Sequence, residues 1–114
     1  MFPESNINRL PLVFKADAGK NYFQFHINGQ LASLEYYMKQ KGRIVLERLE
    51  ISKYLNKVEV GNALIERVLE YVHQADFKIV AIDPEVKKYL QKNSQYQKLV
   101  ALDSPLDHYA KPVA

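Results

Sequence analysis

The residues with the clearest chemical use surround the helix start predicted at Val60-Gly61-Asn62. A strand over residues 43–51 leads into this start through a turn over 52–59, and another strand follows over 77–82. A helix start offers unbonded N–H groups and the positive end of the helix dipole to an anion. Strand, turn, helix and strand in this order are therefore typical of a site for a phosphate-bearing cofactor.

The side chains of this turn both support and oppose an anion site. The turn contains little glycine and carries Glu59, a carboxylate placed where a phosphate would lie. At about 4 Å in water the two charges would repel by about 1 kcal/mol, and Lys57 would offset part of this repulsion. Glu59 and Gly61 each also have a purely structural interpretation, which stays open. Glu59 is also favoured by the helix dipole, and Gly61 could either admit a phosphate or ease the turn into the helix.

Two carboxylates beside this unit are candidates for accepting a proton. Glu50 lies near the end of the strand over 43–51, and Asp83 follows the strand over 77–82. Either could act as a general base if it reached the reacting group. Each also has a structural interpretation: Glu50 as a solvated strand residue, and Asp83 as the N-cap of a helix that Pro84 begins.

The first half of the chain predicts antiparallel strands that would support this site. Residues 12–15 predict a short edge strand, and the aromatic and β-branched residues of 22–27 predict another. Asn28-Gly29 predicts a hairpin into a strand over 30–39, because both residues accept a positive φ. In the strand over 43–51 the alternation places Ile44, Leu46, Arg48 and Glu50 on one face, and Val45, Glu47, Leu49 and Ile51 on the other.

The second half predicts helices alternating with a buried strand. An apolar stripe at three- and four-residue spacing predicts a helix over 60–74, and the apolar run of 77–82 predicts a strand covered on both faces and parallel to its neighbour. A helix over 83–92 and a last turn or short strand over 95–100 follow. The fold class is α+β: an antiparallel meander, then strand–helix–strand–helix on one mixed sheet. We expect one domain over 11–100, a lead-in over 1–10 and a tail over 101–114.

Composition narrows the classes of protein. The chain has 114 residues, of which 47% are hydrophobic and 25% charged, as in an ordinary single domain. It has no cysteine, and its three histidines are far apart, so we expect neither a disulfide framework nor a metal site. The N-terminus is unlike a signal peptide and no apolar run is long enough to span a membrane, so we expect a cytoplasmic protein. The net charge is +3 and the lysines are scattered, which does not predict a nucleic-acid interface.

Residues 21–100 resemble the small, single-domain branch of the GNAT N-acetyltransferase superfamily. In that branch a His-Thr-x-Val-like strand end is followed by Arg-Gly-x-Gly-x-Gly and later by Cys-Pro-x-Val. The matching segments here are Arg48-Leu49-Glu50-Ile51, Asn56-Lys57-Val58-Glu59-Val60-Gly61 and Asp83-Pro84-Glu85-Val86, followed by Tyr89-Leu90 and Asn93-Ser94-Gln95-Tyr96. Lys57 and Glu59 replace two motif glycines, Arg48 stands in place of the histidine, and Asp83 stands in place of the cysteine.

The resemblance implies a site for acetyl-coenzyme A and an amine acceptor of unknown identity. The pantetheine arm would lie along the strand at Leu49 and Ile51, and the acetyl carbonyl would face a backbone N–H that stabilises the oxyanion. The pyrophosphate would lie on the turn and helix start, at Lys57, Val58, Glu59, Val60, Gly61 and Asn62. Glu50 and Asp83 are the candidate catalytic residues. The alternative is a degenerate GNAT fold that has lost catalysis and serves as a binding or interaction module.

Overall fold

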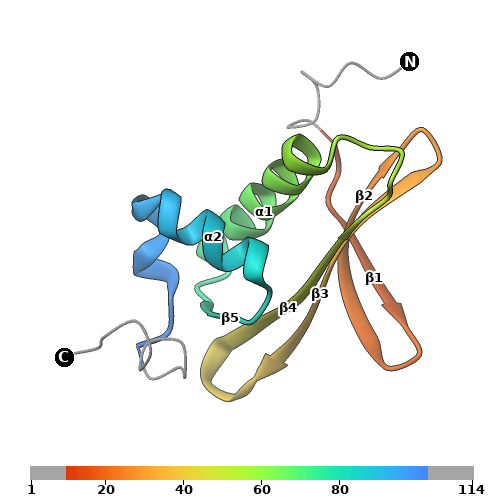
Figure 1. Cartoon of the computed structure of the whole chain (residues 1–114). Coiled ribbons are helices and arrows are strands. Elements are labelled where there is room, and N and C mark those ends of the chain that lie inside the picture. Colours follow the sequence, from red (N-terminus) through yellow and green to blue (C-terminus); the bar gives the residue numbers. More distant parts are fainter. Residues whose placement is uncertain (1–9, 103–114) are drawn as a thin grey trace.

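The predicted hairpins form a sheet whose strands follow one another in chain order. The computed structural model describes residues 10–102. Its strands are β1 (Val13–Asp17), β2 (Lys20–Ile27), β3 (Gln30–Lys39), β4 (Arg43–Ile51) and β5 (Lys78–Ala81), in the order β1-β2-β3-β4-β5 (Figure 1). The first four are antiparallel neighbours, whereas β5 is parallel to β4. The α+β meander with a mixed sheet is therefore confirmed.

Local turn chemistry explains the first half of the sheet. Asn28 and Gly29 join β2 to β3 with φ angles of 51° and 79°, which confirms the hairpin. A short 3-10 turn, η2 (Gln40–Gly42), joins β3 to β4. The edge strand predicted at 12–15 is β1, which pairs only with β2 among the described strands.

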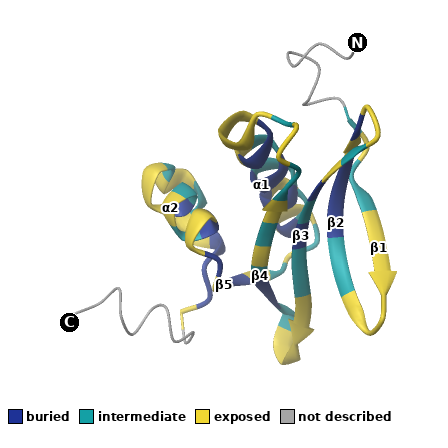
Figure 2. Cartoon of the chain, turned by 45° about the vertical axis from the view of Figure 1, so that its right-hand side comes forward, coloured by how far each residue is buried: buried dark blue, intermediate teal, exposed yellow. Residues whose placement is uncertain are grey.

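The helices cover one face of the sheet and share one core with it. Helix α1 (Lys57–Gln74) lies between β4 and β5 in the chain, and α2 (Pro84–Lys92) follows β5 and leads into the 3-10 segment η3 (Ser94–Leu99). Figure 2 shows buried residues along β2, β3 and the inner sides of the helices, while most of β1 is exposed. The predicted stripe of α1 is buried in this core: Leu64, Val68, Leu69 and Val72. Val45, Val80 and Ala101 form a second, smaller cluster, so β5 is covered on both faces as predicted.

Helix α1 begins three residues earlier than predicted. Asn56 caps it, because the Asn56 side-chain oxygen accepts the N–H of Glu59 at 2.9 Å. The connection from β4 is therefore shorter than the predicted turn over 52–59, and Lys57, Val58 and Glu59 lie in the first helical turn.

The predicted faces of β4 are wrong beyond Leu46. Glu35 pairs with Arg48 and Tyr36 pairs with Leu46, so Glu47 is an extra residue that forms a β-bulge. The bulge shifts the alternation by one residue. As a result Leu49 and Ile51 join Ile44 and Leu46 on the face that α1 covers, while Arg48 and Glu50 lie on the other face.

Candidate functional site

A gap opens where β4 and β5 separate. The parallel pairing ends with Leu46 and Ala81, after which β4 continues to Ile51 and the chain after β5 turns into α2. The N–H of Ser52 bonds the carbonyl of Leu31 on β3, at 3.0 Å. Because backbone groups alternate in direction along a strand, the N–H and C=O groups of Leu49 and Ile51 point away from β3 and into the gap.

A cleft of about 580 Å³ lies beside this gap, between the first half of α1 and α2. Its lining combines the start of α1, one residue of β4 and one side of α2: Leu49, Lys57, Val58, Gly61, Asn62, Ile65, Glu85, Lys88, Tyr89, Lys92 and Asn93. Five of these were predicted as cofactor residues: Leu49, Lys57, Val58, Gly61 and Asn62. The structure does not bring the other three to this lining, since Val60 is buried in the core, Glu59 lies elsewhere on the first turn of α1, and Ile51 lines a different cleft.

Gly61 lets α1 lie close to β4. It is the fifth residue of α1 and is buried, so it does not lie in the turn before the helix. A Cβ atom at this position would lie 3.4 Å from Leu49 Cδ2 and 3.9 Å from Ile51 Cγ1. The missing side chain therefore provides both close helix–strand packing and open space at the floor of the cleft.

The charges around the cleft favour an anion. Lys57, Lys88 and Lys92 contribute positive charge, and Glu85 is the acidic residue of the lining. Lys88 and Lys92 are four residues apart on α2, which places them on one side of the helix. The sequence-based cofactor residues did not include Lys88 and Lys92, although this spacing was a usable signal.

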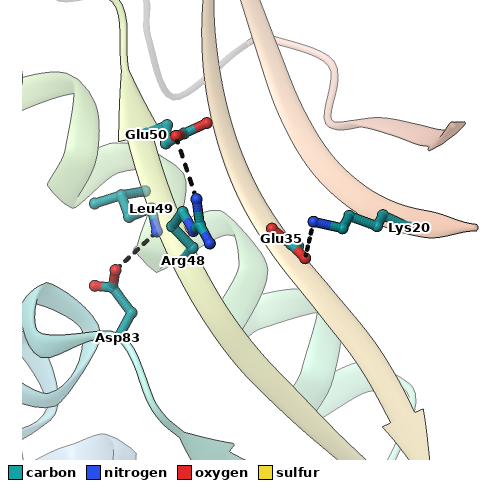
Figure 3. Close-up of polar contacts among 6 residues, drawn as sticks. All are labelled: Lys20, Glu35, Arg48, Leu49, Glu50 and Asp83. Carbon is teal, nitrogen blue, oxygen red and sulfur yellow. Dashed lines mark hydrogen bonds and ion pairs between the residues drawn. The ribbon is translucent and has the colours of Figure 1, made fainter. Parts of the chain in front are cut away.

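Asp83 is the most enclosed polar group of the gap. It is 6% exposed, and its Oδ1 accepts the N–H groups of Glu85 at 2.7 Å and Val86 at 3.1 Å. The predicted N-cap of α2 is therefore confirmed. Its Oδ2 accepts the N–H of Leu49 at 2.8 Å, so one carboxylate joins α2 to β4 across the gap (Figure 3).

Glu50 lies in a different environment from Asp83. Its exposed carboxylate is 3.9 Å from Arg48 Nη1, as Figure 3 shows, and such an exposed pair contributes little to stability. Glu50 lines a second, wider cleft of about 940 Å³ together with residues of β3 and of the β4–α1 connection. Leu49 and Lys57 line both clefts, so the two clefts meet at the end of β4. Of the two predicted catalytic carboxylates, Glu50 therefore lines one of these clefts and Asp83 lines neither.

Tyr89 places a phenol in the first cleft. The pKa of Tyr89 is raised to about 12, mainly by burial and additionally by the nearby Glu66, Tyr96 and Glu70. Tyr89 is therefore protonated near neutral pH and can donate a hydrogen bond there but cannot act as a base. Tyr96 packs near Tyr89, with ring centroids 6.1 Å apart, but is not part of the lining.

This raised pKa predicts a loss of stability at alkaline pH. The unfolded chain releases the Tyr89 proton near pH 10 and the folded chain near pH 12, so the contribution is complete below pH 10 and falls as pH rises towards 12. Urea unfolding at pH 9 and pH 11 should show a smaller loss for Tyr89→Phe than for the wild type. Tyr54→Phe is the control, since Tyr54 is 72% exposed, and it should follow the wild type. Equal losses for all three proteins would contradict the prediction.

A metal site and a membrane-spanning helix find no support among residues 10–102. In this part of the chain, no group of three or more histidine, aspartate or glutamate side chains is arranged to hold a metal ion. Within the same residues, no helix combines the length and the apolar character needed to cross a membrane.

Comparison with known proteins agrees with this architecture. A family model described as GCN5-related N-acetyltransferase matches residues 22–99. The solution NMR structure of a GCN5-like proposed N-acetyltransferase from Staphylococcus aureus is similar, with a TM-score of 0.57 and 27% sequence identity. The similarity covers 79% of this chain and 88% of that one. Among curated proteins, none matches this chain.

Proposed function

Because this chain belongs to the GCN5-related N-acetyltransferase family, we propose that it binds acetyl-coenzyme A between α1 and α2 and transfers the acetyl group to an amine. The observation that carries the proposal is the cleft of about 580 Å³, which combines lysines, the start of α1 and the outward-facing backbone of β4. A polyanionic cofactor with a long amide-containing arm needs these three features together.

The residues present fit the parts of this cofactor. The first turn of α1 and the cationic side chains of Lys57, Lys88 and Lys92 would hold phosphate groups. The missing Cβ of Gly61 leaves room beside Leu49, and the outward-facing carbonyl of Leu49 and the backbone of Ile51 would align the amides of the pantetheine arm. When bound, the cofactor supplies a thioester whose carbonyl carbon an amine can attack.

The second cleft would receive the amine. Its carboxylate, Glu50, would attract an ammonium group and take up its proton at a position next to Leu49, where the two clefts meet. In this proposal Glu50 is the candidate base, while Asp83 is committed to the N–H groups of Leu49, Glu85 and Val86.

A second candidate function is a domain that binds coenzyme A or a partner without acetyl transfer. One observation favours it: Asp83 Oδ2 already accepts the Leu49 N–H at 2.8 Å, and this N–H is an outward-facing donor of β4. A backbone donor that is already bonded to a carboxylate is less able to stabilise an oxyanion.

An NMR titration of the ¹⁵N-labelled chain with acetyl-coenzyme A tests the binding proposal. We expect saturable shifts of the backbone amides that border the cleft: Leu49, Lys57, Val58, Gly61 and Asn62. No shift at millimolar ligand would refute it. Consumption of the thioester with a panel of amines, compared with Glu50→Gln, then separates transfer from binding alone.

Reversing the two α2 lysines should weaken this binding. The double variant Lys88→Glu with Lys92→Glu places two negative charges in the cleft, and we expect an about tenfold higher Kd for coenzyme A, equivalent to about 1.4 kcal/mol. The control, Lys15→Glu with Lys98→Glu, changes the net charge equally at positions outside the lining and should change Kd less than about twofold at 0.15 M salt. Equal effects of both variants would show that the lysines of α2 have no special role.

A further inference from the structure

We propose that Asp83 determines which form of the cofactor the cleft prefers. Its carboxylate holds the Leu49 N–H, so that the cleft binds the free thiol of coenzyme A more tightly than the thioester of acetyl-coenzyme A. This inference rests on the proposed binding of coenzyme A. It does not depend on which amine, if any, accepts the acetyl group.

The Leu49 N–H is the donor in question because of the bulge at Glu47. The bulge changes the phase of β4 just after its last pairing with β5, so that the first outward-facing N–H beyond the bulge belongs to Leu49. The carbonyl of Leu46, the last β4 residue that pairs with β5, already accepts the N–H groups of Ile82 and Asp83, at 2.9 and 3.2 Å. An arm that lies along β4 therefore meets the Leu49 N–H at the apex of the gap.

Asp83 cannot release this N–H by a simple side-chain rotation. Its Oδ1 caps α2 through two N–H groups, its side chain is buried, and its backbone is bonded to Leu46. Moving Oδ2 away from Leu49 would also disturb the cap of α2. The carboxylate is therefore a fixed part of the gap when a ligand arrives.

The chemistry of the two ligands then differs at this point. A thioester carbonyl oxygen is a hydrogen-bond acceptor and would compete with Asp83 Oδ2 for the Leu49 N–H. Two acceptor oxygens would then face each other with one donor between them, which is unfavourable. A thiol carries a weak S–H donor that a carboxylate oxygen can accept. Asp83 therefore disfavours the acetyl form and tolerates the free thiol.

The variant Asp83→Ser tests this assignment. Serine is also a favourable N-cap, but its shorter side chain cannot cap α2 and reach Leu49 together. We expect the wild type to bind coenzyme A about tenfold more tightly than acetyl-coenzyme A, and Asp83→Ser to move this ratio by about tenfold towards the acetyl form. The Leu49 amide should lose hydrogen-exchange protection in the same variant.

The matched control is Asn56→Ser, which exchanges the cap of α1 and leaves Leu49 untouched. It should change both Kd values together and leave their ratio unchanged. Binding of both ligands with the same ratio in the wild type and in Asp83→Ser would overturn the inference alone. If Asp83→Ser does not fold, the wild type still decides, because equal or tighter binding of acetyl-coenzyme A overturns the inference. Absence of binding of either ligand would refute the proposed function, and the inference with it.

Discussion

Replacing Phe23 with alanine should lower the free energy of unfolding by about 3–5 kcal/mol. The Phe23 side chain is fully buried, and its ring stacks on Tyr36 with the centroids 4.1 Å apart. Phe14 and Tyr71 meet the same ring edge-on, at 5.4 and 5.6 Å. The truncation would therefore leave a cavity at the centre of an aromatic cluster that joins β1, β2, β3 and α1.

Urea unfolding measures this effect, with Phe14→Ala as the control. Phe14 belongs to the same cluster but is 52% exposed, so its loss should cost about 1–2 kcal/mol. If the two variants are equally stable, burial of the Phe23 ring does not determine the stability of this cluster.

Replacing Gly61 with leucine should have the largest effect on ligand binding. A Cβ atom would already lie 3.4 Å from Leu49 Cδ2, so a leucine must either displace β4 or enter the cleft. We expect a stability loss of about 1–3 kcal/mol from overpacking, and an about hundredfold higher Kd for coenzyme A. Urea unfolding and the NMR titration measure the two effects separately.

Gly61→Ala is the matched control for this substitution. Its methyl group meets the flexible end of Leu49 at a distance that a small shift can relieve, and alanine favours a helix by about 1 kcal/mol relative to glycine. We expect Gly61→Ala to be at least as stable as the wild type, with only a small change in Kd. Wild-type affinity in Gly61→Leu would show that the cofactor does not lie beside Gly61.

Features with local causes could be predicted from the sequence. Asn28-Gly29 fixes a hairpin because only its own backbone angles are needed, and Asp83-Pro84 fixes a helix start because cap and first residue are adjacent. The bounds predicted for β3 and β4 agree with the structure for the same reason, since turn residues mark their ends.

Features that need a partner elsewhere in the chain could not be predicted in the same way. The bulge at Glu47 exists only in the pairing of β4 with β3, and the alternation of β4 by itself gave the wrong faces. The bond from Leu49 to Asp83 joins residues 34 positions apart. The start of α1 is predicted three residues too late for another reason. Gly61 indicates a turn at the helix start, whereas the residue that caps the helix is Asn56.

The strand order has a consequence for how the chain folds. Strands β1 to β4 each pair with the next strand along the chain, so three hairpins can form from neighbouring segments. Among the described strands, only β5 needs the chain to pass through α1 before it can pair with β4. Loop closure of this kind slows folding, because entropy is lost before the contacts form. We therefore expect the β4–β5 pairing beside Asp83 to be the last part of the sheet to form, so that the shape of the gap becomes fixed late in folding.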